Sequence, residues 1–268
     1  MSLESFAVEA AGGRATLQYA DLTATSGGPN PGPPVVFVHG LGGASTLEYA
    51  QVAAQPGLAG RRRLLVDLIG SGRSDRPRDF DHTVEGQARC LDSFLTALGL
   101  TRVVLYGHSM GGAISLSLAA LDAGRVASLV LSESNLDAGG GPESRAIAGQ
   151  DADRFARVGW PGLLDAVRAS GVPWIRTLPL SSPAAVQAEA VSLVAGVVPS
   201  WRQILYGLGC PRFHLFGSHT LPDPDFEELP RHGVATIMVP DCGHNMAWEN
   251  PAGVADGIVP CLEATLEG

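Results

Sequence analysis

The stretch RVVLYGHSMGGAISLSLAALDA, residues 102–123, joins three patterns in direct succession. RVVLY is short and continuously apolar, as is typical of a strand that is buried on both faces of a sheet. GHSMGG is a glycine-rich turn, and the residues after it have the length and composition of a helix. A strand, a tight turn and a helix in this order present Ser109 at the top of a sheet and at a helix N-terminus, where backbone amides favour a developing negative charge. We therefore predict that Ser109 is a nucleophile.

Further apolar runs on either side of this stretch predict the rest of the sheet. They are PVVFV (34–38), RLLVDL (63–68), ASLVL (127–131), RFHLF (212–216) and VATIMV (234–239). Helical patterns lie between them at about 46–58, 83–98 and 251–266, and alternating residues at 5–10 and 14–20 predict an N-terminal hairpin. Strands that alternate with helices predict an α/β fold with a mostly parallel sheet that is covered on both faces.

The alternation of strands and helices stops after residue 140, and the next strand pattern begins beyond residue 207. The residues between them predict three or four helices and no strand. An insertion between two parallel strands leaves the sheet at the carboxyl ends of the strands, where α/β proteins bind their ligands. We therefore predict a core of residues 1–140 and 207–268, with a helical cap of residues 141–206.

Three tryptophans, Trp160, Trp174 and Trp201, fall within the predicted cap. Large aromatic side chains often line apolar pockets, although they also pack helices against one another. His108 lies beside the predicted nucleophile in the chain. We predict that these four residues line a substrate pocket.

Two further glycine-rich turns complete a candidate reaction centre. HGLGG, residues 39–43, follows the run PVVFV directly, so that the backbone N–H groups of Leu41 and Met110 are candidates for an oxyanion hole. His244 lies in DCGHNM, after the last strand pattern and before the last helical one. A histidine at that place is the expected base for a serine nucleophile.

Four motifs in this order resemble those of the α/β-hydrolase superfamily. They are HGLGG (39–43), DLIGSGRSDRP (67–77), GHSMGG (107–112) and DCGHN (241–245). The resemblance extends over the chain outside the cap, and it implies an α/β-hydrolase fold and serine-hydrolase chemistry. Dehalogenases and epoxide hydrolases of that superfamily carry aspartate at the position of Ser109, so the serine argues against both activities.

The histidine base needs a carboxylate that orients it. The resemblance implies an aspartate at the end of a G-x-x-D turn, after the strand that precedes the histidine. This chain has GSHT at residues 217–220, so Thr220 stands where the aspartate is expected. The acid therefore comes from elsewhere in the chain or is missing.

Four carboxylates are candidates for this acid. Glu133 is preferred, because it ends the strand ASLVL and because certain dehalogenases and lactonases of the superfamily are similar in placing their acid after that strand. Asp223 and Asp225 are alternatives, but Pro222 and Pro224 restrict how that segment can bend. Asp137, in the glycine-rich exit towards the cap, is a further alternative.

Composition excludes several other classes of protein. The net charge is −9 and all 18 basic residues are arginine, so a lysine Schiff base and a phosphate-loop lysine are impossible and nucleic acid is not an expected partner. The four cysteines have no metal-binding spacing, and we expect neither a metal nor a cofactor. The first ten residues lack the pattern of a signal peptide, and no apolar run has the length of a membrane span, so we expect a cytoplasmic protein without a membrane partner.

The sequence thus predicts a serine hydrolase that acts on a small carboxylic ester or lactone through an acyl-enzyme on Ser109. A carbon–carbon bond hydrolase that acts on a diketone-like substrate is an alternative, since it uses the same residues. A binding or receptor protein of the same fold with reduced catalysis is another, for which the threonine at residue 220 is the only support. No feature of the sequence indicates an oligomeric state.

Overall fold

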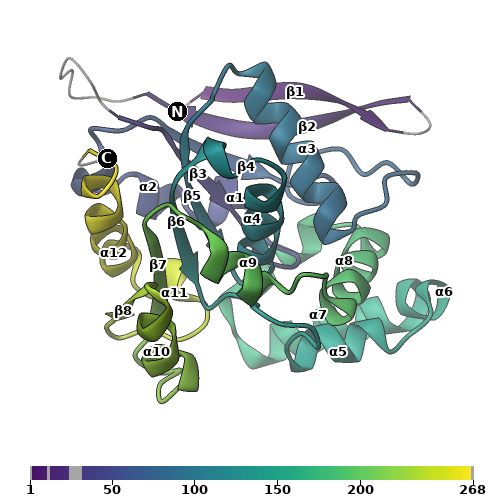
Figure 1. Ribbon diagram of the computed structural model, residues 1–268. Coiled ribbons are helices and arrows are strands. Elements are labelled where there is room, and N and C mark those ends of the chain that lie inside the picture. The colour runs from purple at the N-terminus through teal and green to yellow at the C-terminus, as the bar shows by residue number, and fades with distance from the viewer. Residues whose placement is uncertain (1, 11–12, 24–31, 267–268) are drawn as a thin grey trace.

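The computed structural model describes residues 2–10, 13–23 and 32–266, and its centre is one eight-stranded sheet (Figure 1). The strands lie in the order β1-β2-β4-β3-β5-β6-β7-β8. The hairpin β1–β2 is antiparallel and joins β4 in the antiparallel sense, whereas all the other neighbours are parallel. The bounds are β1 Ser2–Ala10, β2 Gly13–Leu22, β3 Val35–Val38, β4 Arg63–Asp67, β5 Val103–His108, β6 Val126–Ser132, β7 Arg212–Gly217 and β8 Ala235–Val239. The predicted α/β-hydrolase architecture with a mostly parallel sheet is confirmed.

Helices connect the strands and cover both faces of the sheet (Figure 1). The α-helices are α1 Ser45–Glu48, α2 Ala50–Ala53, α3 Val84–Ala97, α4 Met110–Leu121, α5 Pro142–Ala148, α6 Ala152–Arg154, α7 Trp160–Ser170, α8 Pro183–Ala195, α9 Trp201–Gly207, α10 Pro224–Glu228, α11 Met246–Glu249 and α12 Pro251–Glu263. Short 3-10 segments are η1 Pro56–Leu58, η2 Ala123–Arg125, η4 Pro173–Arg176, η5 Leu178–Leu180 and η6 Leu229–His232, and η3 Phe155–Gly159 is a π-helical turn.

The single helix expected at 46–58 is instead divided into α1, α2 and η1. Tyr49 leaves helical geometry at φ −102° and ψ 6°. Gln55 is extended because it precedes Pro56, whose ring disfavours a helical conformation in the residue before it.

Side chains alternate between two hydrophobic layers along the buried strands. In β3, Val36 and Val38 pack in the layer that contains α3 and α4, whereas Val35 and Phe37 pack in the layer that contains α2 and α12. Because both faces are covered, these strands are continuously apolar, which is the pattern that identified them in the sequence. No helix within the described ranges is long and apolar enough to cross a membrane.

The segment between β6 and β7 is helical, and most of it packs around a small core of its own. The helices α5, α7 and α8 and the short segments η3 and η5, which we call the insertion helices, share buried side chains that are separate from the two sheet layers: Ile147, Phe155, Val167, Leu178, Val186 and Ala190. The next helix, α9, differs from them. Its Trp201 is fully buried in the sheet layer, and the indole Nε1 donates a 3.0 Å hydrogen bond to Ser117 Oγ of α4. The expected cap boundary at residue 206 therefore assigns α9 to the wrong layer.

A buried carboxyl group joins the insertion helices to the core. Glu189 of α8 is fully buried, and its Oε1 accepts a 3.0 Å hydrogen bond from Gln87 Nε2 of α3. Burial raises the pKa of Glu189 to about 8, against the opposing effect of the Gln87 hydrogen bond. The side chain is thus expected to carry a proton at neutral pH.

This raised pKa predicts how stability depends on pH. Above pH 4.5, the usual pKa of a glutamate, the unfolded state releases the Glu189 proton while the folded state keeps it. The stability that Glu189 contributes is therefore complete below that pH and is lost as the pH rises through about 8. The loss is on the order of 5 kcal/mol in the free energy of unfolding. Replacing Glu189 with glutamine should flatten this dependence in urea unfolding between pH 5 and 9. The exposed Glu227→Gln is the matched control, and an equal effect of the two substitutions would refute the assignment.

Candidate active site

Ser109 lies in a strained turn between β5 and α4. Its backbone has φ 52° and ψ −120°, a conformation that L-residues adopt only when the surrounding structure imposes it. The Ser109 N–H donates a 2.9 Å hydrogen bond to the carbonyl of Ser132, at the end of β6. The first turn of α4 packs closely against the end of β3, since a Cβ atom on Gly111 would collide with the carbonyl oxygens of Val38 and His39. The two strands and the helix N-terminus together fix the serine at the carboxyl end of the sheet.

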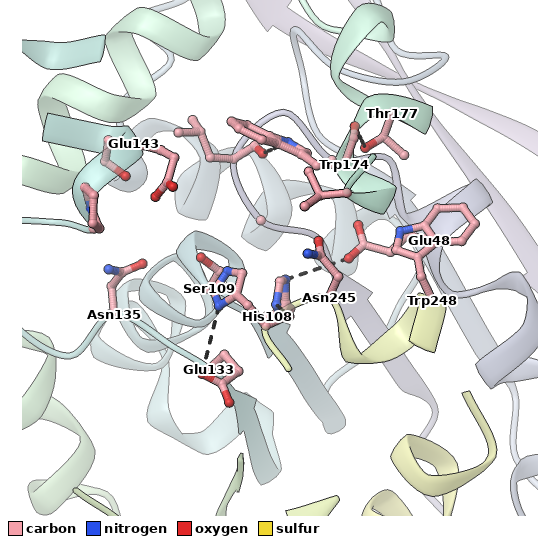
Figure 2. A pocket seen from close by; sticks show the side chains of 18 of the residues that line it. Glu48, His108, Ser109, Glu133, Asn135, Glu143, Trp174, Thr177, Asn245 and Trp248 are labelled. Carbon is pink, nitrogen blue, oxygen red and sulfur yellow. Dashed lines mark hydrogen bonds and ion pairs between the residues drawn. The ribbon is translucent and has the colours of Figure 1, made fainter. Parts of the chain in front are cut away.

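His244 follows β8, and Glu133 follows β6. The two side chains face each other, with 3.9 Å between His244 Nδ1 and Glu133 Oε2. Both line the same cavity as Ser109, and within residues 32–266 no hydrogen bond joins Ser109 Oγ to His244, as is common before substrate binding. His244 is half exposed, at 52%, whereas the Glu133 side chain is only 11% exposed. Figure 2 shows Ser109 and Glu133 on the floor of this cavity.

Two donors hold the carboxylate of Glu133. Its Oε1 accepts a 2.8 Å hydrogen bond from the Gly217 N–H and a 2.6 Å hydrogen bond from Thr220 Oγ1. Burial alone would raise the pKa of Glu133, but His244, Thr220 and Gly217 outweigh it and lower the pKa to about 2. Glu133 is therefore ionised over the whole working range of a hydrolase.

The three other candidate acids have different partners. Asp225 forms a two-pronged ion pair with Arg202, at 2.8 and 2.9 Å, and Asp137 accepts from the same guanidinium at 2.8 Å. Asp223 lines the cavity, but its side chain caps α10 by accepting from the Asp225 N–H at 2.8 Å. Of the four carboxylates considered, Glu133 is the one that the structure brings to His244.

The loop that contains the candidate oxyanion donor Leu41 is held by a buried histidine. Nδ1 of His39 donates to the carbonyl of Gly40 at 2.8 Å, and Nε2 accepts from the Leu68 N–H at 3.0 Å. Leu41 lines the cavity, and Met110 is the first residue of α4, where N–H groups have no intrahelical acceptor. His39 is therefore a structural residue, as its place beside the loop suggests.

His108, which we predicted to line a substrate pocket, lines this cavity and also supports the segment that carries His244. Its Nε2 donates a 2.8 Å hydrogen bond to the His244 carbonyl, and the two imidazole rings lie 4.8 Å apart. Burial lowers the pKa of His108 to about 3, so the ring is neutral and its Nδ1 has no proton. That Nδ1 lies 3.7 Å from Oε1 of Glu48.

The cavity above Ser109 has a volume of about 610 Å³. Of the three tryptophans predicted to line it, only Trp174 does so, and its Nε1 donates a 2.8 Å hydrogen bond to the Leu41 carbonyl. Trp160 packs against Phe155 in the core of the insertion helices, and Trp201 is buried against α4, so those two predictions are wrong. Trp248, four residues after His244 in the chain, lines the cavity instead (Figure 2).

Acidic side chains surround the cavity. Glu48, Glu133, Glu143 and Asp223 line it, whereas its lining contains no arginine and the chain contains no lysine. Glu48 is buried, and burial raises its pKa to about 7. The cavity is thus unfavourable to an anionic substrate. In the described part of the chain, no group of three or more His, Cys, Asp or Glu side chains could hold a metal ion.

Comparison with known proteins agrees with this architecture. The family model for the alpha/beta hydrolase fold matches residues 33–178, more than half of the chain. The chain therefore belongs to the alpha/beta hydrolase family. A thermophilic esterase from Thermogutta terrifontis has a similar fold, with a TM-score of 0.80 and 23% identity over 98% of this chain and 99% of that one.

Sequence relatives match over a shorter segment. One is a 2-hydroxy-6-oxo-2,4-heptadienoate hydrolase from Pseudomonas putida, which is 41% identical over 101 residues, or 37% of each chain. Another is haloalkane dehalogenase 2 from Mycobacterium tuberculosis, which is 35% identical over 101 residues, or 37% of this chain and 34% of that protein. The match spans only about a third of the length of these relatives, and their activities differ from one another.

Proposed function

We propose that this chain is a serine hydrolase that cleaves an uncharged carboxylic ester or lactone. The observation that carries the proposal is the placement of Ser109 in a strained turn beneath a cavity that His244 and the ionised Glu133 also line. Because this turn has serine where dehalogenases of the superfamily carry aspartate, we do not propose a dehalogenase activity.

The arrangement supports a two-step reaction. Ser109 Oγ attacks the acyl carbon while His244 takes the serine proton, and the N–H groups of Leu41 and Met110 stabilise the resulting oxyanion. The bond from the acyl carbon to the leaving oxygen then breaks, and His244 returns the proton to the leaving alcohol. Water next attacks the acyl-enzyme, with His244 again as the base, and releases the carboxylic acid and free Ser109. Ionised Glu133 orients the imidazole and stabilises its protonated form.

A fluorophosphonate probe tests the proposal directly. We expect the native protein to be labelled on Ser109, and we expect Ser109→Ala to lose both the label and at least about 10,000-fold of its hydrolysis of a neutral p-nitrophenyl ester. The exposed Ser93→Ala is the matched control and should retain both. Absence of labelling on the native protein would instead favour a binding protein of this fold.

Carbon–carbon bond hydrolysis is the second candidate, because a relative of that class is 41% identical over 101 residues. The carboxylate of a dienoate would meet an acidic cavity whose lining contains no arginine. The native, unlabelled protein should therefore hydrolyse the neutral ester and leave a matched anionic diketone-like substrate intact. Analysis of the products from the two substrates separates the candidates.

A further inference from the structure

The turn that lacks the family's usual aspartate still contacts the candidate acid. The carbonyl of Gly217 accepts the Thr220 N–H at 3.1 Å, which closes a tight turn directly after β7. Within that turn, the Thr220 hydroxyl lies 2.6 Å from Glu133 Oε1 and 2.8 Å from the Gly217 carbonyl oxygen. The threonine is thus folded against the carboxylate that replaces the missing aspartate.

The single proton of the hydroxyl goes to the carboxylate. Both neighbours of Thr220 Oγ1 can only accept, and a hydroxyl has one proton to donate. The Gly217 carbonyl already accepts a backbone N–H, whereas Glu133 is ionised and lies closer. A hydrogen bond to a charged acceptor is the shorter and stronger of the two possibilities.

Both hydrogen-bond donors to Glu133 contact the same carboxylate oxygen. The Gly217 N–H and the Thr220 hydroxyl both donate to Oε1, and Oε2 is the oxygen that faces His244. Glu133 itself has a φ of 45°, an unusual backbone conformation that the strand end must hold in place. Fixing Oε1 therefore fixes the direction of Oε2.

We propose that Thr220 is a positioning residue for the acid: its hydroxyl holds Oε1 of Glu133 so that Oε2 is directed at His244. This inference rests on the proposed serine-hydrolase function. It also gives a role to residue 220, where the resemblance to the family implies an aspartate: the side chain at residue 220 orients the acid instead of being the acid.

Thr220→Val removes the hydroxyl and keeps the shape of the side chain. We expect kcat on a neutral p-nitrophenyl ester to fall about 10- to 100-fold with little change in KM, the loss typical of one hydrogen bond to a charged group. Thr220→Ser keeps a hydroxyl and should retain most of the activity. The matched control is Thr236→Val in β8, because the Thr236 hydroxyl donates to the Phe226 carbonyl and lies outside the cavity lining.

A second test relocates the acid. Glu133→Gln combined with Thr220→Asp puts a carboxylate back at residue 220, and we expect kcat at least about tenfold above that of Glu133→Gln alone. Such rescue requires residue 220 to lie within reach of the acid position, as the 2.6 Å contact with Glu133 implies. Thr220→Val with native kcat would overturn the inference while fluorophosphonate labelling of Ser109 still supported the hydrolase. Loss of that labelling in the native protein would instead overturn the hydrolase itself.

Discussion

Replacing Glu133 with glutamine is expected to lower kcat about 1,000- to 10,000-fold with little change in KM. The amide has the size of the carboxylate but no charge, so it cannot stabilise the imidazolium that forms on His244 when Ser109 is deprotonated. The amide also presents an NH2 group where the Thr220 hydroxyl and the Gly217 N–H now donate, or where His244 must be oriented. Steady-state kinetics on a neutral ester measures the loss.

The matched control for this substitution is the double variant Asp223→Asn and Asp225→Asn. We expect it to lose less than about tenfold in kcat, because Asp223 caps α10 and Asp225 pairs with Arg202 rather than with the base. A modest loss of stability should accompany it. If the double variant were inactive and Glu133→Gln remained active, the assignment of the acid would be wrong.

Replacing Gly111 with alanine is expected to destabilise the fold by more than about 3 kcal/mol, or to prevent recovery of folded protein. The added Cβ would collide with the carbonyl oxygens of Val38 and His39. These are backbone atoms at the end of a central strand, so they cannot move aside without opening the sheet at the point where α4 begins. Urea or thermal unfolding measures the change.

Gly162, in the first turn of α7, provides the comparison. Apart from its chain neighbours and the backbone of its own helix, no heavy atom lies within 4 Å of a Cβ built at this position, so Gly162→Ala should be neutral or stabilising by up to about 1 kcal/mol. Similar effects at the two glycines would show that the close approach of α4 to β3 is not what requires glycine at residue 111.

The sheet could be predicted from the sequence because burial on both faces makes its central strands continuously apolar. Each predicted run from 34–38 to 234–239 corresponds to an observed strand, within two residues at either end. The helix expected at 46–58 could not be predicted as observed, since its apolar spacing is helical but Tyr49 and Pro56 interrupt the backbone. At these two residues the local backbone conformation ends the helix even though the spacing of apolar residues continues.

The candidate site was predictable where residues belong to turns with a defined geometry. Ser109 and His244 follow strands in glycine-containing turns, and such turns meet at the carboxyl edge of a parallel sheet. Trp201 could not be placed, because its position within α9 does not reveal which neighbour that helix packs on. That Glu48 and Trp248 line the cavity could not be predicted, since a single carboxylate or indole in a short helix has no sequence spacing that indicates a cavity.

The strand register determines which member of the proposed triad can adjust to different substrates. His108 of β5 pairs with Ser132 of β6, so the nucleophile and the acid each follow one residue after a hydrogen-bonded pair of neighbouring strands. Their separation is as rigid as the ladder between those strands. His244 instead follows β8, at the far edge of the sheet, and its side chain is half exposed. We therefore expect any adjustment to substrates of different size to fall to the side chain of His244, while Ser109 and Glu133 keep their separation.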